Sequence, residues 1–358
     1  MNRRKFLSVL SVVPLSRPIG QSVFRESPEH DAEIRGFDFS SLEGPLTPNE
    51  QFYIRDHFPA PALANEEWKL QLSGHVRTPL TMRYAEILRL PRHDLAVTVE
   101  CAGNGVGEGG VSTANWTGIA LRPLLERAGL LPGVKHIRLV GADRGSVGSS
   151  SGAVPYSRSL PLEKALHPDT ILAYGMNGSP LPREHGHPLR AMVPGWYGMD
   201  SVKWLVQMEA LKASDKGYFM TQAYIATRLQ TIGSEQRPVT RMHVKSQIAC
   251  PRNDEVISPG PYRVRGAAWA GENPVAKVEV STDGGGTWAD ASLKTEARPY
   301  VWTLWEYRWV PGTPGIYTLL ARATDNQGGT QSNSRDSLRM DSYEQNFYHS
   351  VRCQVVPN

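Results

Sequence analysis

Alternation of apolar and polar positions dominates the chain from Trp68 onward. In WKLQLSG, residues 68–74, every second residue from Trp68 is apolar, and in DLAVTVEC the residues Val97, Val99 and Cys101 share one face. A period of two is typical of a β-strand with one buried face. Further strands are predicted in the segments HIRLVGAD, ILAYGMNG, LRAMVPG and VKWLVQMEAL.

Two segments between these strands have helical spacing. In TMRYAEILRL, residues 81–90, the apolar residues Met82, Ile87 and Leu90 recur at helix-like intervals. LRPLLERAGL predicts a short helix that ends near Gly129. Strands and short helices therefore interleave, which predicts an α+β fold for the first domain.

The pattern changes after about residue 235. The segments YRVRGAAWAG, VAKVEVSTDGGGTW, VWTLWEYRWV, GIYTLLARATDNQGG and HSVRCQVV are strand-like and are separated by Gly, Pro, Asn and Asp. Regularly spaced strands without long helical patterns predict an immunoglobulin-like β-sandwich. The predicted division is a signal-like N-terminus and linker over 1–45, a catalytic domain over 46–234 and the β domain over 235–358.

Composition narrows the class of protein. A length of 358 residues favours two domains. The formal net charge is +4, with basic and acidic residues mixed along the chain, which does not indicate a nucleic-acid partner. No apolar run approaches the roughly 18 residues of a membrane-spanning helix. We therefore expect neither nucleic acid nor a membrane span.

The N-terminus MNRRKFLSVLSVVPLSRPIG carries Arg3 and Arg4 ahead of a short apolar run that Pro14 interrupts. This pattern is typical of a twin-arginine signal, which exports folded proteins, and it predicts a periplasmic location. Export after folding suits a protein that acquires a cofactor in the cytoplasm. The alternative is the basic start of a cytosolic protein.

The chain has only three cysteines, Cys101, Cys250 and Cys353. Their odd number and wide spacing exclude a disulfide framework, although a Cys250–Cys353 pair stays open. Cys101 follows a predicted strand and precedes a glycine-rich turn. It can be a buried small hydrophobe, a nucleophile, or a thiolate ligand to a metal whose other ligands come from an organic cofactor.

Four segments in order resemble the sulfite oxidase family of molybdenum enzymes. They are FYIRDHFPAP, then VECAGNG with STANWTGIALRPLLERAGL, then ILAYGMNGSPLPREHGHPLRAMVPGWYGMDSVKWL, then the β domain. The resemblance covers roughly residues 45 to 355. It implies that the Cys101 thiolate binds molybdenum, that a pterin dithiolene adds two sulfurs, and that the β domain mediates homodimerisation.

The same resemblance assigns residues to the substrate side of the site. Arg55 and His57 match an Arg and a His that line the cavity, and a guanidinium offers a planar charged fork to an oxyanion such as sulfite. Tyr224 matches a tyrosine close to the metal, with Tyr218 as the competing choice. A phenol can donate a hydrogen bond to a substrate oxygen.

Other matching positions predict how the pterin is held. His185 and Arg190 match residues on its phosphate, whereas the neighbouring His187 is expected on the surface or in a supporting position. The remaining candidates for binding the cofactor are Ser201, Lys203 and, more weakly, Asp143. The alternative for Lys203 is an ordinary edge-strand lysine, and the alternative for Arg55 is a solvated loop cation.

Two departures leave the substrate open. CAGNGVGEGG lacks an arginine that vertebrate relatives carry after the cysteine, and FYHSVRC offers only Arg352 in place of a Trp-His-Arg segment. Sulfite dehydrogenase activity is the first expectation, with oxygen-atom transfer at molybdenum. A sulfane dehydrogenase subunit of a thiosulfate-oxidising system is the second, and a non-catalytic immunoglobulin-like binding protein is the third. Without a CxxCH haem motif, we expect a separate c-type cytochrome to accept the electrons.

Overall fold

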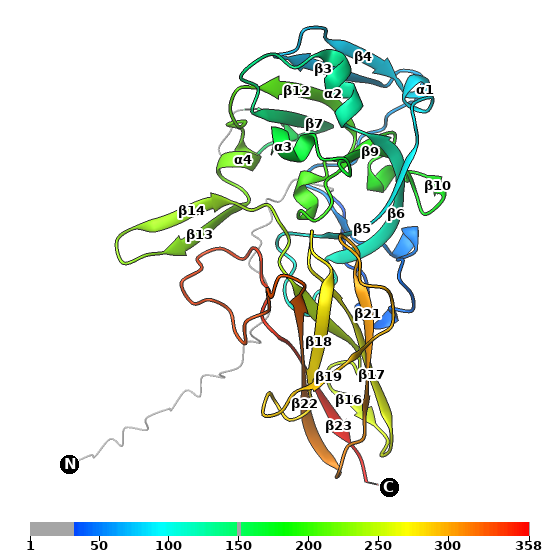
Figure 1. Ribbon diagram of the computed structural model, residues 1–358, viewed down its shortest axis with the longest axis vertical. Helices are drawn as coiled ribbons and strands as arrows, with labels where there is room; N and C mark the ends of the chain where they lie inside the picture. Colours follow the sequence, from blue (N-terminus) through cyan, green and yellow to red (C-terminus); the bar gives the residue numbers. More distant parts are fainter. Residues whose placement is uncertain (1–31, 149–151, 358) are drawn as a thin grey trace, which may run out of the picture.

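The computed structural model describes residues 32–148 and 152–357. The twin-arginine segment lies outside them. Figure 1 shows an upper part with two sheets and short helices, and a lower part built from strands that run along the long axis. Among the described residues, no helix is long and apolar enough to cross a membrane.

The first large sheet contains the strands predicted in WKLQLSG, HIRLVGAD and VKWLVQMEAL, and the last of these forms the central strand β12. Trp68, Leu70 and Leu72 are buried on one face, as the alternation predicts. The strand order is β4-β3-β12-β7-β8, in which β12 is parallel to β3 and antiparallel to β7. The strands are β3 (Lys69–Gly74), β4 (Leu80–Arg83), β7 (His136–Gly145), β8 (Val154–Pro161) and β12 (Leu205–Leu211).

The second sheet holds the strand that leads to Cys101. Val97 and Val99 are buried in one apolar cluster, and the partly buried Cys101 packs against it. The order is β10-β9-β6-β5, with β11 paired to β9. These strands are β5 (His93–Glu100), β6 (Val111–Ala120), β9 (Ile171–Met176), β10 (Ser179–Pro180) and β11 (Arg190–Met192).

The α-helices are short. The prediction of a helix over 81–90 is wrong in its first half, because Met82 pairs with Leu70 in the sheet and only one helical turn follows. The helix before Gly129 is confirmed, and Gly129 ends it with φ 68°, a conformation that glycine adopts without steric cost. The helices are α1 (Tyr84–Ile87), α2 (Arg122–Ala128), α3 (Leu162–Ala165), α4 (Tyr218–Thr221) and the 3₁₀ turns η1 (Phe39–Ser41), η2 (Asn49–Gln51), η3 (Arg183–His185) and η4 (Gly198–Asp200).

The lower part consists of two sheets that share one apolar core, and no helix occurs in residues 239–357. One sheet has the order β15-β17-β21-β20 and the other β16-β23-β22-β18-β19. The strands are β15 (Lys245–Cys250), β16 (Glu255–Ile257), β17 (Tyr262–Trp269), β18 (Val275–Ser281), β19 (Ala289–Asp290), β20 (Ser292–Leu293), β21 (Thr303–Trp309), β22 (Gly315–Asp325) and β23 (His349–Val355). Cys250 and Cys353 are free thiols, so the open disulfide is not formed.

Two small pairs of strands lie outside these sheets. β1 (Ile34–Arg35) pairs with β2 (Ile54–Arg55), and the hairpin of β13 (Ile225–Leu229) and β14 (Ser234–Pro238) projects from the molecule between its two parts (Figure 1). The described end of the predicted linker is packed, because Phe37 and Phe39 bury their rings against Trp302.

Buried polar groups join the upper and lower parts beside Cys101. The Lys245 ammonium donates to Glu100 Oε1 at 2.6 Å and to the Asn104 carbonyl at 3.1 Å. The other Glu100 oxygen accepts from Trp269 Nε1 at 2.8 Å. Both members of the ion pair are buried, so the strand that ends at Glu100 is fixed against the lower part.

Candidate active site

One cavity brings the predicted site residues together. It holds about 650 Å³ of space, its open mouth included, and its walls come from the loop after β2, the end of β5, β7, β8, the loop 183–204 and the start of β13. All nine residues expected at the site line it: Arg55, His57, Cys101, Asp143, His185, Arg190, Ser201, Lys203 and Tyr224.

Cys101 lies at the first position after β5, in a tight turn. Its N–H donates to the Gly110 carbonyl at 2.8 Å, and its carbonyl accepts from Asn104 N at 2.9 Å. Burial raises the pKa of the Cys101 thiol above its ordinary value. A thiol of this kind stays protonated at neutral pH, which disfavours an activated nucleophile; only a strong Lewis acid at the sulfur would convert it to the thiolate.

Two aromatic residues and a neutral histidine form part of the cavity wall. His57 Nε2 and the Tyr224 hydroxyl are hydrogen-bonded, and the His57 ring stacks on Tyr156 at 4.5 Å. Burial, and after it the charge of Arg55, lowers the pKa of His57 well below its ordinary value. Burial also raises the pKa of Tyr224. At neutral pH the imidazole is therefore uncharged and the phenol keeps its proton.

Arg190 is placed by its backbone partners. Its Nη1 donates to the His185 carbonyl at 2.9 Å and its Nη2 to the Ser201 carbonyl at 3.2 Å, while its Nε is buried without a hydrogen-bond partner. The guanidinium lies 4.7 Å from the Trp116 ring centroid. Burial lowers its pKa to about 10, so Arg190 remains a cation at neutral pH.

The loop before β12 places Lys203. The chain turns sharply at Trp204, which has φ 49°, so Lys203 leaves the strand and enters the cavity. Its ammonium forms an ion pair with Asp56 and donates to the Glu184 carbonyl at 2.9 Å. Gly186, at φ 109°, allows the close approach, because a Cβ there would lie 3.0 Å from the Lys203 Cβ. Lys203 is therefore not the edge-strand lysine of the alternative interpretation.

His185 and Asp143 are buried in the cavity wall. His185 Nε2 lies 3.0 Å from the Asn49 carbonyl, and burial lowers its pKa to about 3. Burial raises the pKa of Asp143 to about 7, although the positive charge of Lys203 acts to lower it. The Asp143 Oδ1 atom is buried without a hydrogen-bond partner. Burying a polar atom unpaired is costly, so a ligand that bonds to it would recover free energy.

Comparison with known proteins gives the family. Residues 57–219 match the oxidoreductase molybdopterin binding domain and residues 236–356 the Mo-co oxidoreductase dimerisation domain. Sulfite oxidase of Gallus gallus is 34% identical over 320 residues, which is 81% of this chain and 68% of that protein. The chain is a member of the sulfite oxidase family. The mitochondrial sulfite oxidase of Homo sapiens is 31% identical, over 88% of this chain and 63% of the human protein.

A solved relative has the same overall structure. The sulfane dehydrogenase SoxCD from Paracoccus pantotrophus superposes with a TM-score of 0.80 at 28% identity, covering 97% of this chain and 92% of that chain. As a sulfite oxidase family member, the protein is a molybdopterin-dependent oxidoreductase. A non-catalytic binding protein does not account for the match of a catalytic domain over 57–219.

The residues present fit a molybdenum-pterin cofactor. No group of three or more His, Cys, Asp or Glu side chains that could hold a metal occurs in the described part of the chain. A metal at Cys101 would thus take its other ligands from a cofactor, as a molybdopterin provides. The unpaired Arg190 Nε and Asp143 Oδ1 offer a donor and an acceptor to such a cofactor.

The structure also separates the alternatives that this family resemblance left open. Tyr224 lines the cavity, whereas Tyr218 begins α4 and does not. His187 lies outside the cavity beside Tyr84, at 5.9 Å between ring centroids. Arg352 is 61% exposed and pairs with Asp254 on the surface, so it does not replace the missing cavity arginine.

Sequence reasoning missed several cavity residues. Asp56 stands between Arg55 and His57, and an acidic residue next to a candidate cation is a signal that could have been used. Tyr156 gives no such signal, because it lies in the ordinary strand β8. Its hydroxyl donates to the Met199 carbonyl at 2.7 Å, which fixes the ring under His57.

Proposed function

We propose that this protein is a sulfite dehydrogenase that oxidises sulfite to sulfate and passes the electrons to a separate c-type cytochrome. The observation that carries the proposal is the meeting of the Cys101 thiol with Arg55, His57 and Tyr224 in one cavity. Relatives named sulfite oxidase, in vertebrates and in Arabidopsis thaliana, support the same substrate.

In this proposal the chain holds the cofactor at two places. Cys101 Sγ would bind the molybdenum, and polar side chains of the cavity would hold the pterin and its phosphate. When bound, the molybdenum-pterin group supplies oxygen-atom transfer and the redox change. The residues proposed to hold the pterin and its phosphate are His185, Arg190, Ser201, Lys203 and Asp143.

The remaining polar side chains act on the substrate. Arg55 brings a permanent positive charge to the cavity, which attracts a sulfur oxyanion. Tyr224, which keeps its proton, donates a hydrogen bond to an oxyanion oxygen, and the neutral His57 holds the phenol in place. Fixed donors of this kind stabilise charge that develops on oxygen during the reaction.

Replacing Arg55 tests the substrate role. We expect Arg55→Gln to raise the KM for sulfite about tenfold or more, because a charge-assisted contact becomes a neutral one. Steady-state kinetics measure the change, with Arg92→Gln, an exposed residue paired with Asp94, as the control. An unchanged KM in Arg55→Gln would remove this residue from the substrate pocket.

Sulfane sulfur is the second candidate substrate class. SoxCD, a sulfane dehydrogenase by its title, is similar over almost the whole chain. The surface position of Arg352 also leaves the cavity with less positive charge than a further arginine beside Arg55 and Arg190 would give. A dianion would bind less tightly under these conditions.

Metal analysis combined with a sulfite-dependent cytochrome c reduction assay decides between these functions. We expect about one molybdenum per chain and turnover with sulfite. Molybdenum without sulfite turnover would favour a sulfane substrate. A protein without molybdenum, made in a host that synthesises and inserts the pterin, would contradict the proposal.

The domain arrangement and location complete the proposal. Residues 46–234 would form the catalytic domain, and residues 235–358 an immunoglobulin-like sandwich that joins two copies of the chain. The match of residues 236–356 to a dimerisation domain supports the homodimer. Residues 1–45 would form the signal and linker. The twin-arginine pattern at Arg3 and Arg4 supports export of the folded protein to the periplasm. Sedimentation analysis and cell fractionation test these two points.

A further inference from the structure

A segment of the lower part, residues 336–344, reaches the edge of the cavity. It runs beside β13: the Leu229 N–H donates to the Leu338 carbonyl at 2.8 Å, and the Met340 N–H donates to the Thr227 carbonyl at 2.9 Å. The Asp341 carboxylate accepts from Thr227 N at 2.6 Å. The segment is thus bonded along the strand that begins next to Tyr224.

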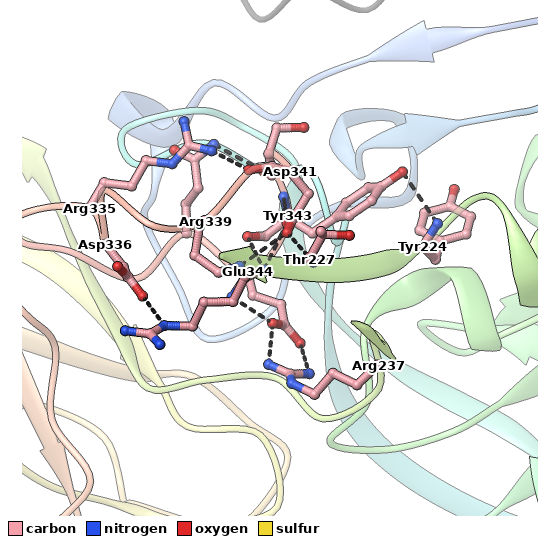
Figure 2. Close-up of polar contacts among 12 residues, drawn as sticks. Tyr224, Thr227, Arg237, Arg335, Asp336, Arg339, Asp341, Tyr343 and Glu344 are labelled. Atoms are coloured by element: carbon pink, nitrogen blue, oxygen red, sulfur yellow. Dashed lines mark hydrogen bonds and ion pairs between the residues drawn. The ribbon is translucent and has the colours of Figure 1, made fainter. Parts of the chain in front are cut away.

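Glu344 ends this segment with a buried carboxylate, 1% exposed, among three basic side chains. Arg237 of β14 donates to both of its oxygens, at 2.9 and 2.6 Å (Figure 2). Arg339 Nη1 donates at 3.1 Å, and His243 Nε2 lies 3.8 Å away. Burial raises the pKa of Glu344, but these neighbours outweigh it and bring the pKa to about 2. We call Glu344 with Arg237, Arg339 and His243 the Glu344 cluster.

Hydrogen bonds connect Glu344 and its neighbour Tyr343 to both sides of the cavity. The Glu344 N–H donates to the carbonyl of Ala102, the residue after Cys101, at 3.0 Å. The preceding residue is Tyr343, whose hydroxyl accepts a hydrogen bond from the Tyr224 N–H at 3.4 Å (Figure 2). The centroids of the two tyrosine rings lie 5.4 Å apart. One short segment therefore contacts the Cys101 turn and Tyr224.

Two residues of this contact, Tyr224 and Glu344, have strained backbone conformations, which indicates that their surroundings hold them in place. Tyr224 has φ 58° and Glu344 has φ 57°, a left-handed conformation that residues with a Cβ rarely adopt. Such conformations cost free energy and persist where the surroundings fix them. The ion pairs of the buried Glu344 carboxylate and the bonds to Thr227 are contacts that can hold both residues in place.

We propose that Glu344 is a positioning residue, which acts through Tyr343 and Ala102 to hold the Tyr224 phenol and the Cys101 turn at a fixed separation. This inference rests on the proposed role of Tyr224 at the substrate. Glu344 does not line the cavity, so it would act on the reaction only through these neighbours. The lower part of the chain would then contribute directly to the geometry of the site.

Glu344→Gln tests the proposal, because it keeps the shape of the side chain and removes its charge. The first measurement is hydrogen–deuterium exchange of the protein prepared without cofactor. We expect the amides of residues 224–229 and the Glu344 amide to exchange about tenfold faster than in the unmodified chain. Asp254→Asn, which breaks the exposed pair with Arg352, is the matched control and should leave these amides unchanged.

The second measurement compares sulfite kinetics in two backgrounds. We expect Glu344→Gln to lower kcat/KM about tenfold in the otherwise unmodified enzyme and less than twofold when Tyr224 is already Phe, since coupled residues are not additive. Molybdenum content should stay at the level of the unmodified enzyme in every variant. Tyr343→Phe should reproduce part of the loss, again only when Tyr224 is present.

Three results would overturn the proposal. They are unchanged exchange at residues 224–229, an equal loss of kcat/KM in both backgrounds, or loss of molybdenum as the sole cause of the lower rate. If the unmodified enzyme holds molybdenum but does not oxidise sulfite, the proposed function fails, and the same comparison is made with a sulfane substrate. The exchange experiment is independent of that outcome.

Discussion

Cys101→Ser is expected to lower turnover at least about a thousandfold while the protein stays folded. A serine hydroxyl has almost the same size as the thiol, but it is a hard donor that ionises far less readily, and molybdenum in a sulfur-rich shell needs a thiolate. The backbone bonds of residue 101, to Gly110 and from Asn104, do not involve the side chain and are kept.

Turnover, molybdenum content and thermal unfolding of Cys101→Ser are measured together. Cys250→Ser is the control, because Cys250 is a free thiol in β15 and lies outside the cavity. We expect that variant to retain molybdenum and activity. Undiminished activity of Cys101→Ser with molybdenum still bound would contradict the single-ligand role of this cysteine.

Lys245→Met is expected to have the largest effect on stability, about 3 to 5 kcal/mol of unfolding free energy. The change leaves the Glu100 carboxylate buried with only Asn104 Nδ2 and Trp269 Nε1 as donors, at 3.0 and 2.8 Å. A buried charge that loses its counter-ion retains the cost of desolvation without the compensating attraction. Because Glu100 precedes Cys101, we expect activity to fall as well.

Urea unfolding followed by fluorescence measures this loss. Lys277→Met is the control, since Lys277 pairs with Glu279 at 3.0 Å on the surface and is 47% exposed. Exposed ion pairs contribute about 0 to 1 kcal/mol, so the control should unfold close to the unmodified protein. Equal midpoints for both variants would show that the Glu100–Lys245 pair does not stabilise the fold.

The position of these groups explains why the site depends on both parts of the molecule. Glu100 and Asn104 bind Lys245 on the lower part, and Ala102 accepts from Glu344 on the same part. The turn that carries Cys101 is therefore held by backbone and side-chain bonds from beyond residue 240.

The sequence by itself determined the elements and the residue types of the site. Alternation over 68–74 and 94–101 predicted β3 and β5, and the helix before Gly129 was equally readable, because these signals depend on neighbouring residues. The motif around Cys101 and the matching segments around Arg55, His185 and Lys203 named the residues that line the cavity. Secondary structure and residue type depend on short stretches of the chain, so they can be predicted without the fold.

Only the tertiary structure decided which of those residues meet and in what state. The first half of the segment 81–90 became a strand because β3 lies beside it, which no local period reveals. Arg352, a candidate by sequence, is exposed on the surface, while Asp56, Tyr156 and Glu344 lie at or near the cavity although the sequence analysis singled out none of them. Burial and distance between remote segments set the charges and contacts of a site, and both arise only when the chain is folded.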